Sequence, residues 1–68
     1  MTEHLANAIK AERERAGLTQ AALAERVGVS RKTVNTVENG VFTPSATLAI
    51  KLARALNVLV EQLFWIED

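Results

Sequence analysis

The chain has 68 residues, 49% of them hydrophobic, and its 8 basic and 8 acidic side chains give a formal net charge of zero. This length predicts one small domain over residues 1–68, without room for a separate effector-binding or catalytic domain. The neutral balance means that any attraction to nucleic acid must come from local charge. The sequence has no cysteine, no apolar run of bilayer length and no signal pattern at its start, so we expect a cytoplasmic protein without membrane contacts, disulfides or thiolate-bound metal.

A first helix is predicted from Thr2 or Glu3 to Ala16, just before a glycine that can end it. Its apolar stripe contains Arg13, and the stripe of a later helix is broken in the same way by Glu38. Two opposite charges aimed at a core are costly unless they pair. We therefore predict a structural ion pair between Arg13 and Glu38 that holds the first helix against the later one.

Two short helices joined by a tight turn are predicted over residues 19–39. Thr19 and Ser30 each precede a helical pattern, and their hydroxyls can accept a hydrogen bond from a free amide of the first turn. Apolar pairs flank both caps in the staple arrangement that fixes chain entry into a helix: Leu18 with Leu23, and Val29 with Val34. Gly28 can take the left-handed conformation that a sharp turn needs. This is the layout of a helix-turn-helix, with its second helix at 30–39.

The outward face of the helix at 30–39 is basic and amide-rich and carries no carboxylate. Arg31 and Lys32 can donate to guanine. The amide of Asn35 can pair with adenine, and the methyl group of Thr36 can touch thymine. A polar face on an arbitrary helix is usually only solvated. Within a helix-turn-helix, however, these residue types favour the reading of bases in a major groove, and Asn35 is the weakest of the candidates.

Two more helices are predicted after the helix-turn-helix. Ser45 can cap a helix over Ala46–Leu56, whose outer side carries Ile50. Ile50 is either an isolated exposed apolar residue or part of an interface. A last helix is predicted around Val60–Phe64, although Leu59 stands where a serine or threonine cap is expected.

The C-terminal end concentrates apolar side chains that a short chain has little core to hide. Residues 60–68, with Phe64, Trp65 and Ile66, are therefore predicted to form a dimerisation tail, as a short strand or an extended segment, and Ile50 is a further interface candidate. Two-fold pairing sets two recognition helices about 34 Å apart, one turn of DNA. Alternatively, Trp65 folds back over the first and last helices as intramolecular core.

The stretch LTQAALAERVGVSRKTVNTVENG, with AERERAG before it and a P-S helix start and a final L-F after it, resembles the phage repressor and Cro family, also called the XRE family of bacterial regulators. The resemblance implies an all-α, compact five-helix fold like that of the lambda repressor. It also implies that Arg31, Lys32 and Thr36 occupy base-reading positions, and that Gln20 braces the helix that carries them. The implied contacts to the sugar-phosphate backbone come from Thr19, Gln20, Asn39 and Thr43.

One departure from the family pattern lies in the loop after the recognition helix. Relatives often carry a lysine after the glycine, whereas this chain has Val41 followed by Phe42. A phosphate contact is thereby missing, and because each such contact adds to affinity through counterion release, we expect moderate binding to each half-site.

The function predicted from these features is sequence-specific binding of double-stranded DNA by a homodimeric transcriptional regulator on a palindromic operator. The alternative is a protein-interaction module, such as an antitoxin, that binds a toxin, a polymerase subunit or another regulator instead of DNA. That alternative predicts apolar or acidic residues at positions 31, 32 and 36. A third possibility, a purely structural role, leaves the cations unexplained. No phosphate loop, metal cluster or nucleophile pattern occurs, so we expect no enzyme activity, no cofactor and no metal.

Overall fold

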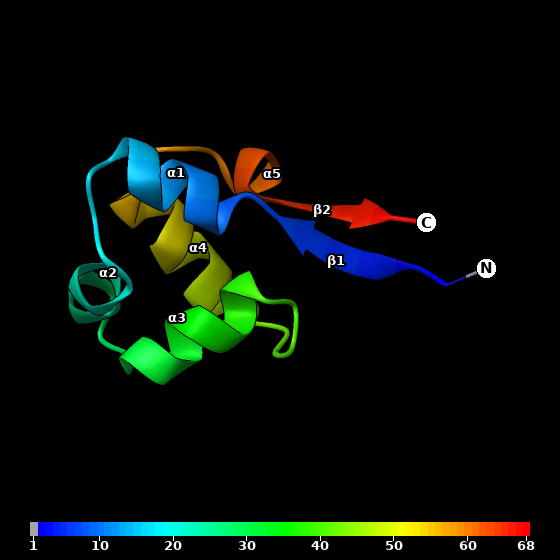
Figure 1. The fold of residues 1–68 in the computed structure, drawn as a ribbon. Coiled ribbons are helices and arrows are strands. Elements are labelled where there is room, and N and C mark those ends of the chain that lie inside the picture. The colour runs from blue at the N-terminus through cyan, green and yellow to red at the C-terminus, as the bar shows by residue number, and fades with distance from the viewer. Residues whose placement is uncertain (1) are drawn as a thin grey trace.

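Five helices and two short strands form the fold in the computed structural model, which describes residues 2–68 (Figure 1). In chain order they are β1 (His4–Asn7), α1 (Ile9–Arg15), α2 (Gln20–Val27), α3 (Arg31–Glu38), α4 (Ala46–Ala55), α5 (Val60–Leu63) and β2 (Phe64–Glu67). Figure 1 shows the helices gathered in one body, from which the paired strands project with both chain ends at their tip. The predicted five-helix fold with a short C-terminal strand is confirmed.

The core is built from apolar residues of every helix. Its largest fully buried side chains are Ile9, Leu23, Leu52, Leu63, Val34 and Val37. Ala24, 3% exposed, is the small residue of α2 in this core, and α2 packs against both α3 and α4. A small residue at a helix crossing lets the backbones approach closely. Within residues 2–68, no helix has the length and apolar character that crossing a bilayer requires.

Side-chain caps fix where three helices begin, as the sequence predicts. The hydroxyl of Thr19 accepts from the amide of Ala22 at 3.0 Å, and that of Ser45 accepts from the amide of Leu48 at 3.1 Å. In α3 the cap is Ser30, whose hydroxyl accepts from Thr33. Each cap satisfies an amide that the helix itself leaves free. Because these starts are set locally, the short helices at 19–39 have defined directions.

The start of the chain differs from the prediction, because residues 4–7 form a strand and not the first half of a helix. β1 pairs antiparallel with β2, with His4 opposite Glu67 and Asn7 opposite Phe64. The side chain of Asn7 also accepts from the amide of Ile9 at 3.0 Å, which marks the helix start at that point. The pairing partner is more than fifty positions away along the chain. A tertiary contact therefore overrides the local helical pattern.

The last helix, α5, has an incomplete N-terminal cap, which allows a test of how much side-chain caps stabilise these helices. Gln62 accepts from the amide of Leu59 at 2.8 Å, but Leu59 has no side-chain acceptor for the free amides of the first turn. Leu59 is 64% exposed, so its replacement removes little packing. We expect Leu59→Ser to complete the capping box and raise the free energy of unfolding by about 0.5–1 kcal/mol in urea denaturation. A fall in stability contradicts this assignment.

Candidate nucleic-acid interface

The residues predicted to read bases lie on the outer side of α3. Arg31, Lys32 and Asn35 are exposed and Thr36 is half-buried. The opposite side of the helix is held in the core, because Val34 and Val37 are 1% and 2% exposed. The capped start and the buried inner side fix the rotation of α3 about its axis. The outer side is thus presented to solvent in one defined orientation.

A nearly buried ion pair ties the C-terminal end of α3 to α1. Nε of Arg13 donates to Oε2 of Glu38 at 2.7 Å, and Nη2 donates to Oε1 at 3.3 Å. The side chains are only 11% and 4% exposed. Nη1 of Arg13 also donates to the carbonyl oxygen of Leu18 at 2.9 Å, at the entry to α2. One guanidinium therefore joins α1, the α1–α2 loop and α3; the sequence predicts its pair with Glu38 but not its contact with Leu18.

The pairing with Glu38 favours the charged form of Arg13. The hydrogen bond to Glu38 raises the pKa of Arg13 above its already high ordinary value, against an opposing effect of desolvation. A cation whose pKa is raised on folding stabilises the protein at all pH values below its unfolded pKa, and this contribution is lost only as the pH rises through the folded value. The contribution of the Arg13 cation is therefore present at neutral pH and is lost only in strongly basic solution.

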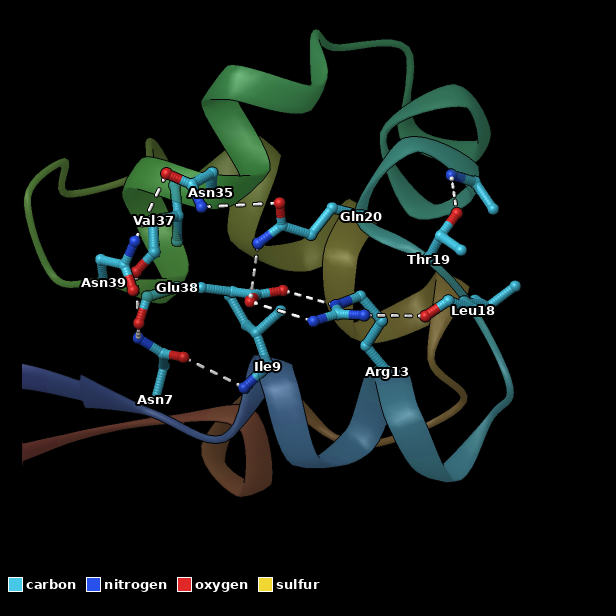
Figure 2. Close-up of polar contacts among 11 residues, drawn as sticks. Asn7, Ile9, Arg13, Leu18, Thr19, Gln20, Asn35, Val37, Glu38 and Asn39 are labelled. Carbon is cyan, nitrogen blue, oxygen red and sulfur yellow. Dashed lines mark hydrogen bonds and ion pairs between the residues drawn. The ribbon is translucent and has the colours of Figure 1, made fainter.

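A chain of side-chain hydrogen bonds runs from this pair to the surface of α3 (Figure 2). Nε2 of Gln20 donates to Oε1 of Glu38 at 3.1 Å, and Asn35 Nδ2 approaches Oε1 of Gln20 at 3.5 Å. Asn39 Nδ2 then donates to Oδ1 of Asn35 at 3.3 Å. Gln20 is thus placed to brace α3, as the resemblance implied. Each end of the Asn35 amide thus has one partner within the protein, and one N–H and one oxygen lone pair remain for a base.

The residues predicted to contact the DNA backbone lie at the start of α2, at the end of α3 and in the loop that follows α3. Thr19 is exposed but uses its hydroxyl as the cap of α2, and Gln20 follows it at the first helical position. The first amides of α2 lack intrahelical acceptors, as in any helix, and can face an anion. Asn39 ends α3 and is exposed, and Thr43 is exposed in the loop that follows.

Asn7 is a structural residue that sequence reasoning missed. Its Nδ2 donates to the carbonyl oxygen of Val37 at 3.1 Å, and it lies 3.4 Å from that of Glu38. Since its Oδ1 accepts from Ile9, one side chain joins the start of α1 to the end of α3. The available signal was an asparagine inside an apolar pattern, a residue type that favours helix caps over helix interiors.

The residues predicted to form a dimer interface fall in three different environments. Phe64 is 8% exposed and belongs to the core, so its prediction as a dimer contact is corrected. Trp65 and Ile66 are 40% and 61% exposed on β2, where Trp65 pairs with Ala6 and its indole N–H donates to Oε2 of Glu67 at 3.0 Å. Ile50 is 47% exposed on α4, whose main contacts are with α2 and α5.

Comparison with known proteins gives consistent similarities over most of the chain. A helix-turn-helix family model matches residues 9–63. The uncharacterized HTH-type transcriptional regulator YgzD of Bacillus subtilis is 42% identical over 62 residues, covering 91% of this chain and 94% of that protein. Antitoxin HipB of Escherichia coli is more distant, with 35% identity over 79% of this chain and 57% of its own length.

Solved structures share both the fold and part of the sequence. The restriction-modification controller protein C.AhdI from Aeromonas hydrophila superposes with a TM-score of 0.76 and 33% identity, covering 79% of this chain and 82% of that one. The P22 c2 repressor, solved in complex with a synthetic operator, superposes with a TM-score of 0.75 and 30% identity, covering 78% of this chain and 80% of that one.

Proposed function

Because the chain belongs to the helix-turn-helix family of transcriptional regulators, of the phage repressor and Cro (XRE) type, we propose that it binds a specific DNA operator by inserting α3 into the major groove. The observation that carries this proposal is the outer face of α3. It presents Arg31 and Lys32 to solvent, it has no carboxylate, and its orientation is fixed by the pair of Arg13 with Glu38. A rigid donor-bearing helix of this kind suits base recognition.

The proposal assigns the parts of the site by their chemistry. Arg31 and Lys32 donate to base acceptors, such as O6 and N7 of guanine or O4 of thymine. The backbone amides at the start of α2, around Gln20, face a phosphate on one side of the groove. The side-chain amide of Asn39 faces a phosphate on the other side. Asn35 serves mainly to hold Gln20 and Asn39 in place, since its amide already contacts both.

A selection from random-sequence duplexes tests the proposal. The protein is bound to the pool at two salt concentrations, and the retained sequences are compared with those retained by an Arg31→Ala, Lys32→Ala variant. We expect enrichment of one motif by the wild type, loss of that motif with the variant, and weaker binding at the higher salt concentration. Retention without any preferred sequence, or salt-insensitive binding, contradicts the proposal.

We further propose that the regulator binds a palindromic operator as a homodimer, through Trp65 and Ile66 of β2. β1 and β2 form a two-stranded sheet within the described residues, and an isolated strand pair is only marginally stable in water. Strand β2 also exposes large apolar side chains beside its open edge. A second copy that covers this surface would both complete the sheet and relate two α3 helices by two-fold symmetry.

The dimer is tested by sedimentation equilibrium on the wild type and on a Trp65→Ser, Ile66→Ser variant. We expect a dimer for the wild type and a monomer for the variant, because the variant removes the apolar contact and leaves the helical core intact. Leu59→Ser, the same kind of change at another exposed apolar residue, should remain dimeric. Ile50→Ser shows whether the interface extends over α4. A monomeric wild type at high concentration contradicts the proposal.

The protein-interaction alternative, in which the fold binds a toxin or a polymerase, finds support in the distant similarity to antitoxin HipB. The two functions are not exclusive, but they differ in what α3 should present. Cations at positions 31 and 32 favour a polyanionic partner over an apolar protein surface. Salt-insensitive behaviour toward DNA in the selection experiment would move the protein-partner function to first place.

A further inference from the structure

We propose that the α3–α4 loop adds a methyl-reading element to the DNA interface: Val41 and Phe42, with the methyl group of Thr36, form an apolar groove that receives the C5-methyl group of a thymine. This inference rests on the proposed function and extends base recognition beyond α3. The groove lies along the exposed side of α3, and its lining residues are Ser30, Lys32, Thr33, Thr36, Val41 and Phe42. It therefore adjoins Lys32, which the proposed function places among the base contacts.

The hydroxyl of Thr36 is already engaged inside the protein. Its Oγ1 contacts two carbonyl oxygens of its own helix, those of Lys32 and Thr33, each at 3.0 Å. A hydroxyl carries one proton, and here that proton is directed to the backbone. The group that Thr36 offers to a ligand is consequently its methyl group.

The other two hydroxyls in the groove are engaged in the same way. Oγ of Ser30 accepts from the amide of Thr33 at 3.1 Å, and the hydroxyls of Ser30 and Thr33 lie 3.0 Å apart in a shared hydrogen bond. The polar atoms of this surface are therefore largely satisfied by one another. Apart from the ammonium group of Lys32, the groove presents mainly carbon atoms.

Val41 and Phe42 are held beside α3 by their backbone. Both of their amides donate to the carbonyl oxygen of Thr36, at 2.9 and 3.1 Å. Their side chains nevertheless remain 79% and 49% exposed. Two apolar residues anchored at the edge of a polar recognition surface, and not buried by the fold, fit a role in contacting an apolar ligand group.

Among the groups that a major groove displays, the C5-methyl of thymine is the apolar one. The acceptor O4 lies next to that methyl in thymine, so Lys32 at the rim can donate to it. In 5-methylcytosine the neighbouring group is the N4 amine, a donor, which suits an ammonium group poorly. The chemistry of the groove and of its rim thus favours thymine.

The test is a methyl scan of the selected operator, in which each thymine in turn is replaced by deoxyuridine. This change removes the methyl group and leaves base pairing intact. At one thymine of each half-site, we expect the wild type to lose about fourfold in affinity, the fold-change for one buried methyl group. Val41→Ser should bind the unmodified operator about fourfold more weakly and lose nothing further at that position. A cytosine at that position should not recover affinity when it is methylated at C5.

Two outcomes overturn the inference while leaving the proposed function in place. In the first, no deoxyuridine substitution lowers the affinity of the wild type. In the second, the substitution lowers the affinity of Val41→Ser as much as that of the wild type at the same position. Leu59→Ser, which changes an exposed apolar residue outside the groove, should respond to deoxyuridine as the wild type does. If no operator is enriched at all, the proposed function itself is overturned, and this inference with it.

Discussion

Replacing Arg13 with methionine is expected to lower the free energy of unfolding by about 3–5 kcal/mol, because it leaves a carboxylate buried without a partner. The side chain of Glu38 is 4% exposed, and Arg13 supplies two of its hydrogen bonds. Folded proteins are stable by only about 5–15 kcal/mol, so the variant should lose a large part of its stability. Urea denaturation followed by circular dichroism measures the difference.

Arg15, two positions further along the same helix, provides a matched control. Arg15 pairs with Glu12, but the Arg15 side chain is 65% exposed and the pair is screened by solvent. Arg15→Met should therefore cost less than about 1 kcal/mol. The double variant Arg13→Met, Glu38→Met should recover part of the loss, because it removes the unpaired buried charge. If Arg13→Met costs no more than Arg15→Met, the pair does not hold α1 against α3.

The Arg31→Ala, Lys32→Ala variant should lose affinity for the selected operator by at least about 30-fold. Each good base contact contributes about 1–3 kcal/mol of discrimination, and two are removed. Both residues are exposed, so the fold should be unaffected and circular dichroism should remain unchanged. A fluorescence anisotropy titration with the labelled operator gives the fold-change.

The control for this loss removes the same number of charges from another element. Lys51 and Arg54 are exposed on α4, which has no part in the proposed interface. Lys51→Ala, Arg54→Ala should change the affinity by less than about threefold, a long-range effect that shrinks as salt is added. Equal losses for the two double variants would mean that overall charge, and not the face of α3, accounts for binding.

The elements set by local chemistry could be predicted from the sequence. Thr19, Ser30 and Ser45 each place a helix start by a hydrogen bond within three residues, and such contacts leave a visible pattern. The pair of Arg13 and Glu38 was predictable for a different reason. Each charge interrupts an apolar stripe, and a buried charge requires an opposite one.

The features that depend on distant partners were the ones that sequence reasoning missed. Residues 4–7 carry a helix-compatible pattern, and only the pairing of Leu5 with Ile66 and of Ala6 with Trp65 makes them a strand. The sequence predicts Phe64 at an interface because its neighbours are apolar and close to the C-terminus. In the structure α5 ends at Leu63, and Phe64, the first residue of β2, packs into the core. The alternation of strand side chains then leaves Trp65 partly exposed.

The sequence predicts which residues form the candidate site, but it does not separate the residues that contact DNA from those that hold them in place. The basic face of α3 follows from its helical period and its caps. The tying of Asn35 to Gln20 and Asn39, and the engagement of the Thr36 hydroxyl with its own helix, follow only from side-chain geometry. These contacts separate residues that position the interface from residues that are free to read it.

The most direct test of DNA binding through α3 is an NMR titration of the ¹⁵N-labelled protein with the selected operator, monitored through backbone amide shifts. Binding through α3 predicts that the largest shifts occur in residues 19–22 and 31–43, at the start of α2, along α3 and in the loop after it. The strands β1 and β2 should change little. Largest shifts in α4 and α5, or none on α3, would contradict the claim that α3 is the DNA-binding element.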